Sequence, residues 1–162
     1  SDPDNPTYYS KRSDAFSKLE FHVPSINDSN KTIELQASYV KPYICRAKSY
    51  FELDWCIKSY EAYNEALAIE PNNPESLAGI DMVINKIIEK SKNLYTQYNE
   101  NPFNPYPQLA TNTLKELNLY DSLIKSEWNY DLIKESIKNP DFRKAFECYE
   151  MNFAFEENPI QE

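Results

Sequence analysis

One stretch of the sequence, Tyr39 to Pro71, constrains the fold more than any other. Its apolar positions recur at helical spacing on two segments, which predicts two amphipathic helices joined by a short turn and closed by a proline. Small side chains on the facing sides would let the two helices pack closely: Ala47, Ser59 and Ala66. Aromatic side chains on the same faces would fill the space around them: Tyr43, Tyr50 and Tyr63. The stretch therefore predicts a closely packed helix-turn-helix unit.

The same pattern occurs again about 34 residues earlier, which is the period of tetratricopeptide (TPR) repeats. A shift by one period places Tyr43 on Tyr9, and a shift by two periods places the Pro-Asn-Asn-Pro segment at 71–74 on Pro-Asp-Asn-Pro at 3–6. Small residues, aromatic residues and a closing proline in this order are typical of TPR units. The sequence thus predicts an all-α chain of TPR repeats. We also expect that at least one further repeat precedes Ser1.

The order of the segments predicts how the chain is organised. We expect TPR repeats with a capping helix at 1–98, a proline-rich linker at 99–107, a small helical module at 108–150 and a loose acidic tail at 151–162. The first helices are expected from Asn5 to about Leu19 and from about Pro24 to Gln36, because asparagine and proline favour helix starts. The capping helix starts at Asn73 and is expected to bury one apolar stripe: Leu77, Ile80, Ile84, Ile87, Leu94 and Tyr98.

The charge and the rare residues exclude several classes of function. The formal net charge is −9, so no basic surface for nucleic acid or an anionic membrane is expected. The three cysteines, Cys45, Cys56 and Cys148, lack metal-ligand spacing and are expected to be reduced, half-buried thiols of a cytoplasmic protein. The single histidine, His22, has no nucleophile or acid paired with it in the sequence, and we expect a surface residue. No catalytic site, metal or cofactor is therefore predicted.

Binding is the remaining chemistry, and the first helix of each TPR pair is expected to line a concave groove. Five residues on these helices are candidate peptide contacts: Ser10, Lys11, Lys41, Cys45 and Lys48. The three lysines would place positive charge in the groove of an acidic chain and could pair with peptide carboxylates, including a free C-terminus. The alternative is that they are solvated surface lysines, and the residue pattern alone leaves both open.

Several segments carry a resemblance to a known family. The segments 8–13 (YYSKRS), 31–34 (KTIE) and 41–43 (KPY) resemble TPR units of co-chaperones. They are followed by Asn-Pro-Phe-Asn at 101–104 and a leucine-rich piece ending in 130–137 (YDLIKESI). This order is similar to the first TPR domain, in truncated form, and the adjoining DP domain of the heat-shock chaperone organising protein (Hop) family.

The resemblance implies a partner and a set of contacts. Domains of this family grip the acidic C-terminal tails of 70-kDa and 90-kDa heat-shock chaperones through a clamp of lysines, asparagines and an arginine. Lys41 matches a clamp lysine, whereas a clamp asparagine falls on Lys11 and the clamp arginine on Cys45. A cysteine cannot supply the bidentate hydrogen bonds of a guanidinium group.

Three hypotheses follow from these matches. The chain is a co-chaperone adaptor that binds chaperone tails, or a TPR scaffold that binds another protein surface without a functional clamp, or an appendage of an enzyme whose catalytic domain lies upstream. A missing repeat would also expose the face that bears Tyr9 and Phe16, so we expect self-association.

Overall fold

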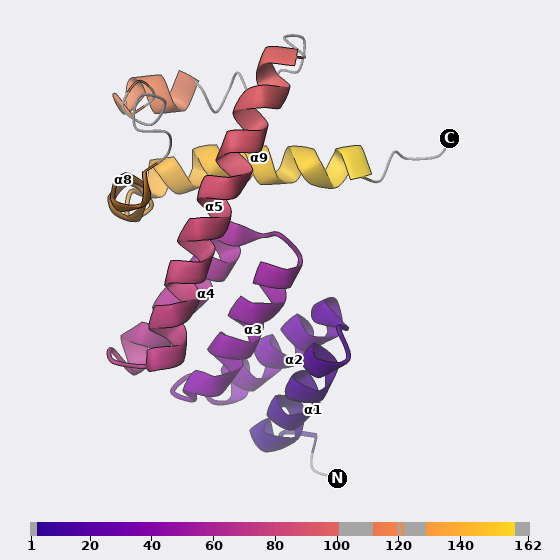
Figure 1. Cartoon of the computed structure of the whole chain (residues 1–162). Helices are drawn as coiled ribbons and strands as arrows, with labels where there is room; N and C mark the ends of the chain where they lie inside the picture. Colours follow the sequence, from indigo (N-terminus) through magenta and orange to yellow (C-terminus); the bar gives the residue numbers. More distant parts are fainter. Residues whose placement is uncertain (1–2, 101–111, 120, 122–128, 158–162) are drawn as a thin grey trace. The chain divides into compact units, whose positions relative to one another are not determined.

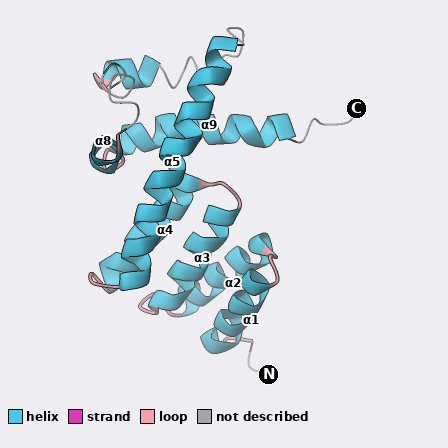
Figure 2. Ribbon diagram, viewed as in Figure 1, coloured by secondary structure: helices cyan, strands magenta, loops and turns pink. Residues whose placement is uncertain are grey.

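The computed structural model describes residues 3–100, 112–119, 121 and 129–157, and all of its regular structure in these ranges is helical (Figures 1 and 2). The chain divides into two compact units, Ser1–Val83 and Ile84–Glu162. The division falls within α5 (Pro74–Glu100). The predicted linker at 99–107 lies mostly outside the described residues, so that boundary stays a prediction.

The first unit contains two helix pairs followed by the start of α5. The pairs are α1 (Pro6–Lys18) with α2 (His22–Leu35), and α3 (Val40–Glu52) with α4 (Cys56–Ile69). Within each pair the helices pack against each other, and α3 also contacts both α1 and α2 (Figure 1). The all-α, helix-turn-helix architecture predicted from the sequence is confirmed.

Hydrogen bonds repeat from one pair to the next with the predicted period. The Tyr9 hydroxyl donates to the Pro3 carbonyl at 2.9 Å, and the Tyr43 hydroxyl donates to the Ala37 carbonyl at 2.8 Å. Both helix-to-helix turns contain a residue in the left-handed region, Glu20 with φ 63° in the first and Asp54 with φ 62° in the second. Such a residue ends a helix by redirecting the chain. The two pairs are thus successive TPR repeats.

The start of the first pair follows the prediction, and the start of α2 differs from it. The Asn5 side chain accepts a hydrogen bond from the Thr7 backbone N–H at 3.0 Å and so caps α1. The predicted start of α2 near Pro24 is wrong, because the helix begins at His22. Proline is tolerated throughout the first turn, where the backbone N–H groups have no helical partner.

The first turns of α5 bury Ser76 and Gly79 rather than Leu77, the first residue of the predicted stripe. Leu77 is 47% exposed, so its predicted burial is wrong, whereas Ser76 and Val83 are fully buried. A Cβ atom on Gly79 would lie closer than 3.0 Å to the Tyr63 ring, which shows how near the two helices come. Gly79 thus leaves room for the buried Tyr63 ring of α4. Ile84 and Ile87 are buried as predicted.

The second unit has its own apolar core. Helix α8 (Tyr130–Ser136) contributes Ile133, and α9 (Pro140–Glu157) contributes Phe142 and Phe146, whose rings stack with centroids 6.4 Å apart. Within this unit Lys90 of α5 forms an ion pair with the buried Glu150 of α9 at 3.6 Å. Helix α9 continues to Glu157, so the prediction of a loose tail from residue 151 is wrong up to that residue. Residues 158–162 lie outside the described part.

The cysteines and the histidine are more buried than predicted. Cys45 and Cys56 are free thiols and are buried rather than half-buried, because both lie on the packed faces of the second repeat. The Cys148 side chain lies outside the described residues. His22 is half-buried, and its Nδ1 atom is buried without a hydrogen-bond partner in the described structure, so it is not a simple surface residue.

Candidate functional site

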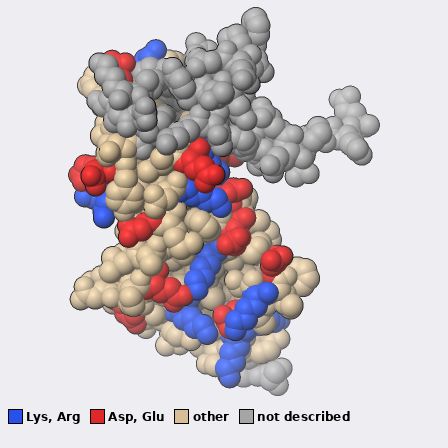
Figure 3. Space-filling model, in the orientation of Figure 1, with Lys and Arg blue, Asp and Glu red and all other residues tan. Residues whose placement is uncertain are grey.

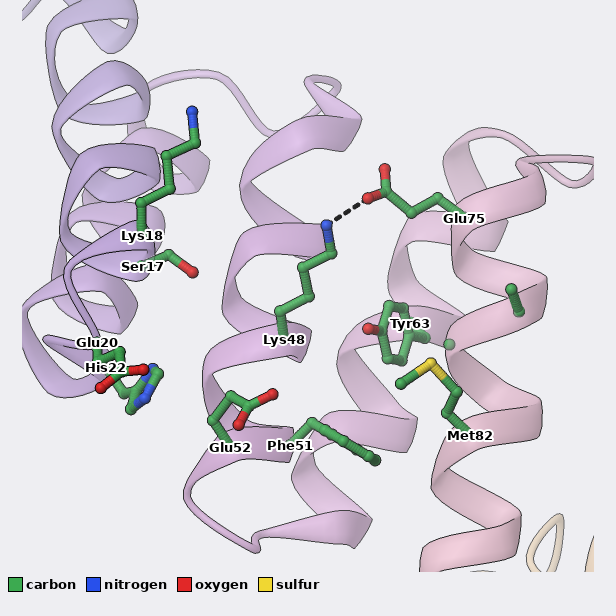
Figure 4. A pocket seen from close by; sticks show the side chains of 12 residues that line it. Ser17, Lys18, Glu20, His22, Lys48, Phe51, Glu52, Tyr63, Glu75 and Met82 are labelled. Carbon is green, nitrogen blue, oxygen red and sulfur yellow. Dashed lines mark hydrogen bonds and ion pairs between the residues drawn. The ribbon is translucent and has the colours of Figure 1, made fainter.

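A groove in the first unit lies between α1, α3 and the first turns of α5. It contains a pocket of about 740 Å³ (Figure 4). The side chains that line it come from α1, the turn after it, the start of α2, and α3, α4 and α5: Ser17, Lys18, Glu20, His22, Lys48, Phe51, Glu52, Tyr63, Glu75, Ala78, Gly79 and Met82. TPR arrays present such a surface because each first helix turns one face away from its partner.

Asp14 of α1 is the centre of a charge cluster in this groove. Its carboxylate accepts a hydrogen bond from the Lys18 ammonium at 2.9 Å and lies 4.0 Å from the Lys41 ammonium of α3. The hydrogen bond from Lys18 lowers the pKa of Asp14, and the charges of Lys41, Lys18 and Lys48 lower it further. Asp14 therefore stays ionised at neutral pH. Its carboxylate is contacted by one lysine of α1 and one lysine of α3.

Lys48 of α3 has a different partner. Its ammonium donates to the Glu75 carboxylate at the first turn of α5, as Figure 4 shows. The position one period earlier than Lys48 is Asp14, and the position one period later than Lys41 is Glu75. The repeat thus places opposite charges on neighbouring groove helices. In Figure 3, acidic and basic side chains accordingly lie interleaved over the first unit.

The five predicted contacts differ in how accessible they are. Lys11, Lys41 and Lys48 are exposed, and Lys48 lines the pocket, whereas Lys11 and Lys41 do not. Ser10 is buried, with its hydroxyl 3.5 Å from the Tyr39 hydroxyl. Cys45 is 6% exposed, and burial raises the pKa of its thiol, so it is a neutral group beneath the lysines. The role of all five as peptide contacts stays a prediction.

Several groove residues were not predicted from the sequence. Lys18, Glu52 and Glu75 line the pocket with charge, while Phe51 and Met82 supply its apolar surface. The repeat period could have indicated Lys18 and Glu52. Glu52 lies one period after Lys18, so the two residues occupy equivalent positions in successive repeats. The sequence did not indicate Met82, because this residue lies outside the predicted apolar stripe of α5. Its side chain is 54% exposed.

The described residues contain neither a candidate metal site nor a helix that could span a membrane. No group of three or more His, Cys, Asp or Glu side chains in that part of the chain could hold a metal ion.

None of the helices among the described residues combines the length and apolarity needed to cross a lipid bilayer.

The fold and the groove define a TPR protein-interaction domain. No protein-family model matches the chain. The chain is 25% identical to human RNA polymerase II-associated protein 3 over 160 residues, which is 94% of this chain and 22% of that protein. It is 30% identical to stress-induced-phosphoprotein 1 of Caenorhabditis elegans over 79 residues, which is 49% of this chain and 25% of that protein.

A plant protein is also similar to part of the chain. The chain is 29% identical to Hsp70-Hsp90 organizing protein 2 of Arabidopsis thaliana over 85 residues, which is 52% of this chain and 15% of that protein. The chain thus spans between 15% and 25% of the length of these three relatives. The similarity supports a TPR co-chaperone relationship in general.

Proposed function

We propose that the chain is a non-catalytic, cytoplasmic co-chaperone adaptor whose groove binds the acidic C-terminal tail of a 70-kDa or 90-kDa heat-shock chaperone. One observation carries the proposal: the groove already holds a carboxylate between two helices, because Asp14 is contacted by Lys18 and by Lys41. A peptide carboxylate could be bound by the same lysines together with Lys11. The similarity to Hsp70-Hsp90 organizing proteins gives the class of partner.

The assignment to the first TPR domain of this family, with a DP-like module at 108–150, is part of the same proposal. The described helices α8 and α9 with their phenylalanine pair fit a small helical module.

Titration with a short acidic peptide tests the proposal. The peptide ends in a free carboxylate, and its control is the same peptide with an amidated C-terminus. We expect measurable binding to the whole chain, and weaker binding of the amide. Lys41→Ala should weaken binding of the free acid about twofold to fivefold, since an exposed ion pair contributes up to about 1 kcal/mol.

Lys144→Ala serves as the matched control, because Lys144 is an exposed lysine of α9 that lies outside the groove. It should leave the affinity unchanged. Equal affinity for acid and amide, or an affinity that does not respond to Lys41→Ala, would contradict the proposed carboxylate site.

A second candidate is a scaffold that binds another protein surface without a clamp. The observation in its favour is that Lys18 and Lys48 are already paired with Asp14 and Glu75. Capture of a chaperone that persists after deletion of the chaperone's C-terminal tail would support the scaffold, and capture that is lost would support the tail adaptor.

A further inference from the structure

The lining of the pocket has more carboxylates than ammonium groups, with three glutamates and two lysines. Its two lysines are partnered, Lys18 with Asp14 and Lys48 with Glu75. Glu20 and Glu52 also line the pocket, and neither has an ion-pair partner among the described residues. The pocket therefore offers two carboxylates that are in no ion pair among the described residues.

The surface between these carboxylates is apolar and aromatic. Phe51 is half-buried beside Glu52, and Met82 is 54% exposed on the facing helix α5 (Figure 4). The buried Tyr63 ring forms the floor, and burial, followed by the negative charges of Glu75 and Glu52, raises the pKa of its hydroxyl to about 12. The pocket thus combines one more carboxylate than ammonium group with an apolar surface. Lysine and arginine side chains fit such a site, because they bury their alkyl stems and keep the charged head near carboxylates.

We propose that this pocket binds a lysine or arginine side chain of the same peptide whose acidic end is held at Lys41 and Lys11. This inference rests on the proposed function, because it places both ends of one ligand in one groove. The partner is therefore a peptide that carries both signs of charge, with an acidic C-terminus and a basic residue upstream of it.

Helix geometry gives the spacing between the two charges. Lys41 and Glu52 are both on α3, and their separation corresponds to about 16 Å along the axis at ~1.5 Å per residue. An extended peptide spans this distance with about five residues at ~3.3 Å each. The basic residue therefore lies about five residues before the C-terminus.

Two peptides that differ at one position test the proposal on the whole chain. Both end in the same acidic residues with a free carboxylate, and the residue five before the end is lysine in one and norleucine in the other. The lysine peptide should bind about threefold to fivefold more tightly. Glu52→Gln should remove this preference, whereas Lys41→Ala should weaken both peptides and leave the preference intact.

Glu116→Gln is the matched control, since it removes the same charge from an exposed residue that does not line the pocket. It should leave the preference unchanged. Equal binding of the two peptides, or a preference that survives Glu52→Gln, overturns the proposal.

A third peptide separates failure of the pocket from failure of the proposed function. If neither acidic peptide binds, an amidated peptide with one lysine flanked by neutral residues is titrated instead. Binding that is lost on Glu52→Gln then supports the pocket without the carboxylate site, and absence of binding overturns the pocket as well.

Discussion

The two TPR repeats have the same backbone and differ in what fills the space between their helices. In the second repeat the packed positions are Ala47, Ser59, Tyr63 and Ala66, whereas one period earlier they are Ser13, Ser25, Ser29 and Thr32. All eight side chains are buried. Both repeats keep one hydroxyl-to-carbonyl bond between their helices, from Ser25 to Ser13 at 3.0 Å and from Ser59 to Ala47 at 2.8 Å. The second repeat adds the buried Tyr63 ring, and the first adds further hydroxyl groups.

The hydroxyl groups of the first repeat form one connected network. The Ser13 hydroxyl donates to the Ser25 carbonyl at 2.9 Å, and the Ser25 hydroxyl donates to the Ser13 carbonyl at 3.0 Å. Ser29 lies 2.7 Å from the Ser13 hydroxyl, and Ser49 of the second repeat donates to Ser25 at 3.1 Å. Close packing of TPR helices thus requires small side chains, while their polarity is free to vary when every hydroxyl has a partner.

The largest expected effect tests the aromatic packing of the second repeat. Tyr63→Ala removes a ring that is 4% exposed and packs against Gly79, so the free energy of unfolding should fall by about 3–5 kcal/mol. Urea denaturation followed by circular dichroism measures this. Tyr8→Ala, at a position 49% exposed, is the control and should cost less than about 1 kcal/mol. Equal losses in the two variants would contradict the account.

A smaller effect tests the buried carboxylate of the first repeat, since the equivalent arginine of the second repeat, Arg46, pairs with the exposed Glu65 instead. Arg12 bonds both oxygens of Asp28, at 2.6 and 2.7 Å, and the position one period after Asp28 is Ala62. The Asp28 side chain is 8% exposed and that of Arg12 42%. Arg12→Met should therefore cost about 2 kcal/mol, since it leaves a buried carboxylate unpaired. Asp28→Ala should cost only about 1 kcal/mol, because water can solvate the half-exposed guanidinium. The reverse order in chemical denaturation would refute this explanation.

The serine network gives a test of additivity. Ser13→Ala should cost about 1–2 kcal/mol, because it leaves the buried hydroxyl of Ser29 without its acceptor. Replacing Ser13, Ser25, Ser29 and Ser49 together by alanine leaves no stranded hydroxyl, so the loss should be smaller than the sum of the four single losses. Unfolding free energies of the five variants decide this. Additive losses would mean that the hydroxyl groups act independently.

The smallest expected effect compares the two turns. Glu20 and Asp54 occupy equivalent left-handed positions, with φ 63° and 62°. Glu20→Gly should raise the free energy of unfolding by about 0.5–1 kcal/mol, because glycine adopts this conformation without steric cost. Asp54→Gly should gain less, since aspartate tolerates the left-handed region better than glutamate. Thermal unfolding midpoints measure both, and a larger gain at Asp54 would contradict the interpretation.

The sequence was sufficient to predict the repeat and most of its helices. Tyr9 and Tyr43 lie one period apart in the sequence, and their hydroxyls make the same hydrogen bond in the structure. The serine network was not predicted, because serine in a helix is usually read as a polar surface residue rather than as a small packing residue. Leu77 was assigned to the core because periodicity counts apolar residues and ignores Gly79, whose lack of a side chain sets the face that packs.

The groove was predictable only in part. The lysines at 11, 41 and 48 could be placed on one face from their spacing, and they are exposed there. The partners of Lys41 and Lys48 could not, because Asp14 and Glu75 reach them from neighbouring helices whose separation depends on the packed residues beneath. The charge balance of the groove is therefore a property of the folded repeats.

The most direct test of the account is the effect of Asp14→Asn on binding of the acidic peptide with a free C-terminus. If Asp14 occupies the place of a ligand carboxylate between Lys18 and Lys41, its neutralisation frees both lysines for the peptide. Isothermal titration calorimetry should then show a Kd lower by about threefold to tenfold in Asp14→Asn, opposite in sign to the change in Lys41→Ala. An unchanged or higher Kd in Asp14→Asn would contradict the assignment of this cluster as the carboxylate site.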